Sequence, residues 1–171
     1  MANHSNSPVI NTDIDNMKNS LTFSPVSLTD ISPLMQIENN CHSHPWSEKT
    51  FKSCIGGRYF GEKLNGTSNE SLNIVGFYIG ELVVDEATLM DICVNPTEQG
   101  KGLGKKLLTQ FIANAKAKGA IKIWLEVRAK NIAAQMLYMN AGFIETGRRT
   151  GYYPSANGFG YEDAIVMCLT C

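Results

Sequence analysis

With 171 residues, 43% of them hydrophobic, the chain has the size of one ordinary domain and can bury a substantial core. Its 15 basic and 16 acidic residues give a formal net charge of -1, which argues against direct nucleic-acid binding and against a membrane surface. No apolar run has transmembrane length and residues 1–20 lack the features of a secretory signal, so we expect a cytoplasmic protein of undetermined oligomeric state.

Residues 1–20 are rich in Asn and Ser and poor in large apolar side chains, so we predict a flexible extension followed by one domain, residues 21–171. Two helices are expected near the start of this domain. Each follows a Thr or Ser side chain that can accept hydrogen bonds from free helix amides, and apolar residues follow at helical spacing. The predicted helices are Thr29 to about Asn40, and Ser47 through Phe51 to Cys54.

The remaining chain alternates between strand-like and helix-like apolar patterns. The predicted strands are Leu72–Gly80, Val83–Val94, Ile121–Arg128, Phe143–Tyr152 and Glu162–Leu169. The predicted helices are Leu103–Ala115, with Gly119 as its end, and a helix that runs to Ala141, with Asn131 as its cap and Gly142 as its end. The first two strands are expected to pair through a turn near Gly80 and Glu81, and Asn65–Ser71 is expected to be a turn-rich loop. This mixed order favours a single α/β sheet layered with helices.

The segment Gln99-Gly100-Lys101-Gly102-Leu103-Gly104 lies between a predicted strand and a predicted amphipathic helix. Its glycines let the backbone approach a ligand closely, and the first free N–H groups of the following helix can bind an anion. We therefore predict a site for a cofactor that carries a pyrophosphate.

Three phosphate-binding motifs place glycines at such a junction. A P-loop needs Gly-Lys followed by Ser or Thr, whereas Gly104 is followed by two lysines. A dinucleotide fingerprint would have its third glycine at Lys105, although Glu126 lies at the distance expected of its acidic residue. The pattern Gln-x-x-Gly-x-Gly fits without adjustment, with Gln99 and Gly102 preceding Gly104.

This pattern resembles the acetyl-CoA loop of the GNAT-type N-acetyltransferases. The resemblance covers about residues 28–169 and includes strings more specific than the glycine loop. These strings are His44-Pro45-Trp46-Ser47-Glu48-Lys49-Thr50-Phe51, Asp85-Glu86-Ala87-Thr88-Leu89, Trp124-Leu125-Glu126-Val127-Arg128, Asn131-x-x-Ala134-x-x-Leu137-Tyr138-x-x-x-Gly142-Phe143, Tyr152-Tyr153-Pro154 and Glu162-Asp163-Ala164. More narrowly, the chain resembles the bacterial ribosomal-protein-alanine N-acetyltransferases, the RimI type.

The resemblance implies an α/β fold with a single mixed, mostly antiparallel sheet flanked by helices. It implies acetyl transfer from acetyl-CoA to the N-terminal alanine of a small-subunit ribosomal protein, the eighteenth. It places the general base at Glu126 and the general acid at Tyr138. The implied acetyl-CoA contacts are the backbone of Ile92, Cys93 and Val94, the loop and helix start at Gln99, Gly100, Lys101, Gly102, Leu103, Gly104 and Lys105, and Asn131.

Direct acetyl transfer to an amine needs a base, an acid and a donor that stabilises the oxyanion. From pattern alone, Glu126 could instead be a solvated strand position and Tyr138 a core aromatic, while Cys93 is expected to be a small buried hydrophobe rather than a nucleophile. The acidic residues Asp85, Glu86, Glu162 and Asp163 could receive a basic peptide or be plain solvated surface. A lysine or small-amine acetyltransferase and a non-catalytic acyl-CoA-binding module remain alternatives.

The chain has an odd number of cysteines, Cys41, Cys54, Cys93, Cys168 and Cys171. Such a set is typical of reduced thiols rather than of a disulfide framework. Cys168-x-x-Cys171 raises the alternative of a zinc site with further ligands from Cys41, His42 and His44, but the irregular spacing argues against it. We expect acetyl-CoA as the acetyl donor and no metal.

Overall fold

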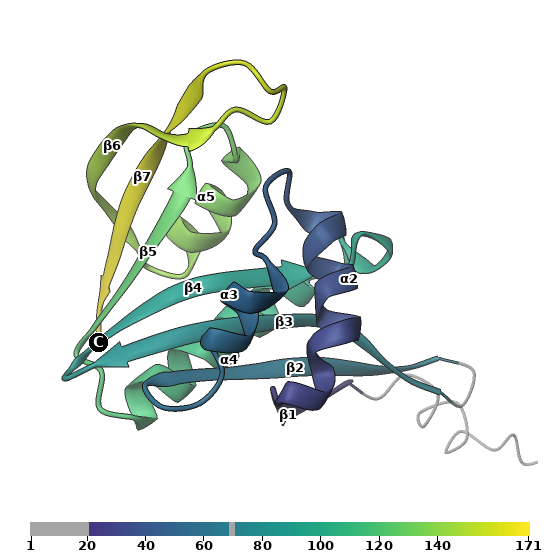
Figure 1. The fold of residues 1–171 in the computed structure, drawn as a ribbon. Helices are drawn as coiled ribbons and strands as arrows, with labels where there is room; N and C mark the ends of the chain where they lie inside the picture. Colours follow the sequence, from purple (N-terminus) through teal and green to yellow (C-terminus); the bar gives the residue numbers. More distant parts are fainter. Residues whose placement is uncertain (1–20, 69–70) are drawn as a thin grey trace, which may run out of the picture.

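The computed structural model describes residues 21–68 and 71–171, and the extension predicted for residues 1–20 lies outside them. The described residues form a seven-stranded sheet with helices on both faces (Figure 1). The strand order is β1-β2-β3-β4-β5-β7-β6, with β4 and β5 parallel and the other neighbours antiparallel. The predicted mixed, mostly antiparallel α/β sheet flanked by helices is confirmed.

The strands are β1 Leu21–Pro25, β2 Tyr59–Ser68, β3 Ser71–Val83, β4 Glu86–Val94, β5 Lys122–Arg128, β6 Ile144–Pro154 and β7 Tyr161–Thr170. The helices are η1 Leu28–Asp30, α2 Ile31–Cys41, α3 Glu48–Ser53, η2 Pro96–Glu98, α4 Leu103–Ala117 and α5 Ile132–Asn140. No helix in this part of the chain has both the length and the apolar content needed to span a bilayer.

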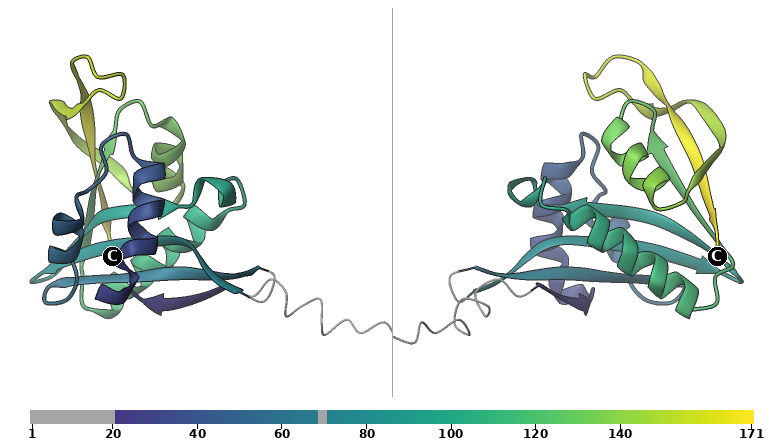
Figure 2. Two further views of the ribbon diagram at one scale, coloured as in Figure 1. Left: turned by 45° about the vertical axis from the view of Figure 1, so that its right-hand side comes forward. Right: turned by 180° about the vertical axis from the view of Figure 1, so that it is seen from behind.

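Helix α4 covers one face of the sheet and α2 and α3 cover the other (Figure 2), and each face has its own apolar core. On one face, α4 buries Leu107 and Phe111 completely, because its apolar residues recur at helical spacing as the sequence predicts. On the other face, Leu34 of α2 and Phe51 of α3 are fully buried against Phe77 of β3. Burial of each such side chain contributes roughly 1.5–3 kcal/mol. The helices are therefore fixed on the sheet from both sides.

The hairpin between β3 and β4 turns at Val84 and Asp85, not near Gly80 and Glu81 as predicted. Val84 has a φ of 57°, in the left-handed region that turns of this kind use. Gly80 instead stays within β3, where a Cβ would lie 2.6 Å from Phe111 Cε2. Its role is to make room for an aromatic ring of α4 rather than to form a turn.

The turn-rich loop predicted for Asn65–Ser71 is also wrong, since β2 continues through Ser68 and β3 begins at Ser71. Asn65 Nδ2 donates hydrogen bonds to Ser24 Oγ at 2.9 Å and to Thr22 O at 3.2 Å. These bonds join β2 to β1, and the sequence analysis predicted neither of these two strands. Tertiary hydrogen bonding therefore overrides the local turn signal of Asn and Gly.

Two of the predicted helix caps are confirmed and one is wrong. Ser47 Oγ accepts a hydrogen bond from Thr50 N at 3.1 Å, and Asn131 Oδ1 accepts one from Ala134 N at 3.1 Å. Thr29 does not cap α2, because it lies inside the preceding 3-10 turn and Asp30 is the residue before the helix.

The sheet divides between β4 and β5. Their parallel pairing covers only Glu86–Leu89 with Lys122–Leu125, and the strands diverge beyond these residues (Figure 1). Residues Asp91–Val94 of β4 therefore pair with β3 on one side and are not paired with β5 on the other. This divergence exposes strand backbone in the middle of the fold.

Candidate active site

The end of β4 supplies backbone groups that the sheet does not use. Ile92, Cys93 and Val94 pair with β3, and the described chain gives them no pairing with β5. Val94 O accepts hydrogen bonds from Gln99 Nε2 and from Cys41 Sγ, each at 3.1 Å. The Gln99 side chain thus ties the glycine loop to the end of β4, a positioning role that motif spacing alone does not reveal.

The glycine loop leads into α4 through two glycines with positive φ. Gly100 and Gly102 both have a φ of 77°, which L side chains adopt only with strain. Gly102 is the residue before the helix and offers no side-chain cap, so the first amides of α4 have no intrahelical acceptor. Their N–H groups and the positive end of the helix dipole form a site suited to an anion.

Two lysines flank this anion site. Lys101 Nζ forms an ion pair with Glu98 Oε2 at 2.8 Å, whereas Lys105 is exposed in the first turn of α4. The Lys101 pair is at the surface, and such pairs contribute little. A bound anion can therefore recruit either side chain at small cost.

Glu126 lies on β5 opposite Val166 of β7, with its side chain partly exposed. Its Oε1 accepts a hydrogen bond from Arg149 Nη1 at 2.6 Å. The Arg149 guanidinium in turn lies 3.9 Å from the centroid of the Tyr152 ring. The carboxylate is therefore held by β6 and is not a freely solvated strand position.

Tyr138 lies on α5 and is 6% exposed, with its ring in edge contact with Phe143. Burial raises the pKa of Tyr138 well above its ordinary value, and negative charge at Asp91 acts in the same direction. The phenol therefore keeps its proton at neutral pH, as a general acid must.

Tyr153 is a further residue of this region to which the sequence analysis gave no role. Burial, followed by negative charge at Glu126 and Tyr152, raises the pKa of Tyr153 to about 12. The Arg128 guanidinium lies 4.5 Å from the centroid of its ring. The Tyr152-Tyr153-Pro154 string indicated that a tyrosine of this segment belongs to the family pattern. The string alone does not predict which of the two tyrosines lies near Glu126.

The four acidic residues weighed as a peptide-binding surface do not form one patch. Glu86 contacts Trp124 Nε1 and Lys122 at the start of β5, whereas Glu162 contacts Arg128 Nη1 at its end. Seven strand residues separate these ends, which amounts to about 20 Å. The combined acidic surface is therefore not formed, and the carboxylates of Glu86, Glu162 and Asp163 each have a partner within the protein.

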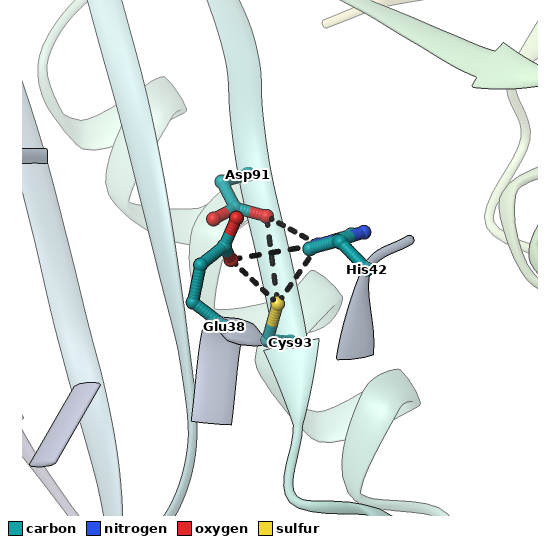
Figure 3. Close-up of side chains that lie close together, drawn as sticks. All are labelled: Glu38, His42, Asp91 and Cys93. Carbon is teal, nitrogen blue, oxygen red and sulfur yellow. Dashed lines mark hydrogen bonds and ion pairs between the residues drawn. The ribbon is translucent and has the colours of Figure 1, made fainter. Parts of the chain in front are cut away.

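A polar cluster lies beside β4 where the sequence analysis expected only a buried hydrophobe. Cys93 is 2% exposed, as expected, but its Sγ lies 3.0 Å from His42 Nε2 and 3.3 Å from Glu38 Oε2 (Figure 3). Asp91 Oδ1 lies 3.2 Å from the same His42 nitrogen. A contact with Cys41 and burial raise the pKa of the Cys93 thiol, so it is not an activated nucleophile.

The terminal cysteine pair has no part in this cluster. Cys168 is buried in β7 opposite Trp124 of β5, and Cys171 is exposed. His42, weighed as a further ligand for that pair, instead joins Glu38, Asp91 and Cys93. The alternative zinc site that the sequence analysis argued against, with Cys168, Cys171 and His42, is thus not brought together in the described residues.

The fold, the uncapped helix after the glycine loop and the unpaired edge of β4 define an acyltransferase architecture. Residues 31–143 match the sequence model of the Acetyltransferase (GNAT) family, and the chain belongs to this family. It is 45% identical to the [ribosomal protein bS18]-alanine N-acetyltransferase of Salmonella typhimurium, over 86% of this chain and 96% of the relative. It is 43% identical to the corresponding Escherichia coli protein with the same coverage.

Solved structures agree with this assignment. The crystal structure of the ribosomal-protein-S18-alanine N-acetyltransferase from Escherichia coli has a TM-score of 0.80 at 43% identity, covering 88% of this chain and 94% of that chain. Arabidopsis thaliana NAA60 in complex with acetyl-CoA has a TM-score of 0.77 at 18% identity, covering 88% of this chain and 98% of that chain. The second comparison shows a shared fold.

Proposed function

We propose that this protein transfers the acetyl group of acetyl-CoA directly to the N-terminal alanine amine of ribosomal protein bS18. The observation that carries the proposal is the 45% identity to an alanine N-acetyltransferase over nearly its whole length. Local features support it: Glu126 directly follows the last residue of β5 that pairs with β4, and the start of α4 at Gly104 lies next to Val94 of β4 and Leu137 of α5.

The residues present fit acetyl-CoA in two respects. The free amides at the start of α4, from Leu103 to Lys105, match the need of a pyrophosphate for several donors on one side. The unpaired edge of Ile92–Val94 matches an extended arm that carries amide groups. Acetyl-CoA supplies the thioester, and the chain supplies position, a proton acceptor and a proton donor.

Glu126 accepts the proton of the attacking amine, directly or through one water. An α-amino group has a reference pKa of about 8, against about 10.4 for lysine, so it reaches the neutral, nucleophilic form more readily. Tyr138 donates its retained proton to the departing thiolate, and backbone N–H groups near Val94 stabilise charge on the carbonyl oxygen. No covalent acetyl-enzyme is needed.

The direct test is acetyl transfer to a synthetic peptide that begins with alanine and has a free N-terminus, beside a twin with a blocked N-terminus. Mass spectrometry then locates the modified atom. We expect acetylation of the free α-amine and none of the blocked twin. Modification of both peptides on a side chain would assign the acceptor to lysine. Acetyl-CoA binding without turnover on either peptide or on small amines would favour the acyl-CoA-binding module.

A further inference from the structure

Four potential metal ligands converge at the junction of α2 and β4 (Figure 3). Glu38 and His42 lie four residues apart and share one face at the end of α2. Asp91 and Cys93 lie two residues apart and share one face of β4. One donor atom from each residue lies within 4.8 Å of every other.

The spacing of these donor atoms matches a tetrahedral zinc site. With a Zn–S bond of about 2.3 Å and Zn–N and Zn–O bonds of about 2.0–2.2 Å, the edges of the ligand tetrahedron are about 3.3–3.6 Å long. From His42 Nε2 the distances are 3.0 Å to Cys93 Sγ, 3.2 Å to Asp91 Oδ1 and 3.6 Å to Glu38 Oε2. From Cys93 Sγ they are 3.3 Å to Glu38 Oε2 and 3.6 Å to Asp91 Oδ1. These five edges need shifts of only a few tenths of an ångström to hold a cation, and the sixth, between Glu38 and Asp91, is at most 4.8 Å long.

A second observation concerns the charge of this cluster, in which the partly exposed His42 is the one potential cation beside the carboxylates of Glu38 and Asp91. Asp91 is 8% exposed, and Oδ1 of its carboxylate faces His42 and Cys93 (Figure 3). Its Oδ2 is buried and has no hydrogen-bond partner among the described residues. Leaving a buried carboxylate oxygen unsatisfied is costly, and nearby groups add a second carboxylate and a thiol but one imidazole. A bound cation would compensate this charge.

We propose that Glu38, His42, Asp91 and Cys93 form a binding site for a thiophilic divalent cation, with Zn²⁺ as the ion that fits best. The mixture of one sulfur, one nitrogen and two oxygens suits Zn²⁺ and is unsuited to Mg²⁺ or Ca²⁺, which take oxygen ligands. On binding, the Cys93 thiol releases its proton to solvent and the thiolate ligates the metal, while His42 ligates as neutral imidazole through Nε2. The His42 side chain is 39% exposed and provides the route from solvent.

The bound ion would cross-link α2 to the end of β4 and so stabilise the folded chain by mass action. This proposal does not rest on the proposed acetyl transfer, because its measurements are metal binding and thermal stability. It assigns the metal to these four residues and not to the terminal pair Cys168 and Cys171.

The test titrates the full-length, chelator-treated and reduced protein with Co²⁺. We expect one Co²⁺ per chain, with thiolate-to-cobalt charge-transfer absorption that Zn²⁺ abolishes by displacement. Cys93→Ser should remove the charge-transfer band. Cys171→Ser removes an exposed thiol and is the matched control that should leave the band unchanged. Absence of the band in the unsubstituted protein, or its persistence in Cys93→Ser, would overturn the proposal.

His42→Gln keeps the proposal testable if Cys93→Ser fails to fold, because the His42 side chain is partly exposed. Loss of one ligand should weaken Zn²⁺ binding by at least about tenfold, on the scale of losing an outer-shell partner. Zn²⁺ should raise the Tm of the unsubstituted protein and raise that of His42→Gln less. Equal affinities and equal Tm shifts in the two proteins would exclude His42 and with it the site.

Discussion

Arg149 Nη1 lies 2.6 Å from Glu126 Oε1, so the carboxylate that we assign as the base is held by a guanidinium from the neighbouring part of the sheet. The same guanidinium stacks on Tyr152. Strand β6 thereby fixes the orientation of a side chain that belongs to β5. Because a Gln side chain can keep this hydrogen bond, Glu126→Gln tests the base with less change in packing than other substitutions at this position.

Glu126→Gln should lower kcat roughly 100-fold or more and leave acetyl-CoA affinity nearly unchanged. The amide oxygen of Gln can still accept the hydrogen bond from Arg149, so the packing of β5 and β6 is retained while the base is lost. Steady-state kinetics with the alanine peptide, together with equilibrium acetyl-CoA binding, checks this. An unchanged kcat would show that another group, such as a water held near Tyr153, acts as the base.

Tyr138→Phe should lower kcat about 100-fold with little loss of stability. The ring packs against Phe143, and among the described residues its hydroxyl has no hydrogen-bonding partner, so removing the oxygen leaves the packing intact. The measurement pairs kcat with the free energy of unfolding in urea. Loss of stability in step with loss of activity would instead assign Tyr138 to the core alone.

Gly104→Ala should weaken acetyl-CoA binding and stabilise the fold at the same time. A Cβ at this position would lie 3.6 Å from Leu137 Cδ2 and 4.0 Å from Val94 Cγ2, between α5 and the end of β4. We expect about a tenfold rise in Kd, or about 1.4 kcal/mol, while alanine favours the helix by up to about 1 kcal/mol. Gly147→Ala adds a Cβ in open space and is the matched control. Unchanged affinity in Gly104→Ala would show that the cofactor passes elsewhere.

Direct transfer predicts that the enzyme itself is never acetylated. The Cys93 thiol is buried and its pKa is raised, first by its contact with Cys41 and then by burial. Intact-mass measurement after incubation with acetyl-CoA and no acceptor should therefore find the unmodified chain. An acetyl group on Cys93 that disappears when the peptide is added would replace direct transfer with a two-step mechanism.

The local sequence pattern was sufficient to predict a helix or strand wherever that element has its own periodicity or cap. The apolar stripe of α4, the alternation of β5 and the Asn131 cap of α5 all fall as the sequence predicts. Each depends on residues within one or two turns of each other. The sequence was least informative at β1 and β2, whose pairing joins Thr22 to Asn65 and has no local signature.

The cluster beside β4 could not be predicted because a bulge determines its face. The pairing of β3 with β4 shifts between Ile79 and Gly80. As a result, Leu89 packs in the core under α4, whereas Cys93 packs in the core under α2, although regular alternation would place both on one face. The sequence contains no pattern that predicts this shift in pairing. In addition, the partners Glu38 and Cys93 lie 55 residues apart.

The partly buried ion pair between Asp30 and Lys63 predicts acid sensitivity of the fold. Burial raises the pKa of the Asp30 carboxyl, but hydrogen bonds from Lys63 and Ser27 outweigh it and hold that pKa below its ordinary value. Because the folded pKa is lowered, the pair stabilises the fold above the unfolded pKa of about 3.9. This stabilisation is lost as the pH falls through the folded value.

Asp30→Asn should therefore lower the free energy of unfolding by about 2 kcal/mol at pH 7, since a charged hydrogen-bond acceptor is lost. The difference from the unsubstituted protein should shrink toward zero as the pH falls below about 4, because a protonated carboxyl resembles the amide. Urea unfolding over a pH series measures both. Glu48→Gln breaks the exposed pair with Lys52 and should change stability by less than about 0.5 kcal/mol. A constant difference for Asp30→Asn at every pH would show that packing, not charge, is what Asp30 contributes.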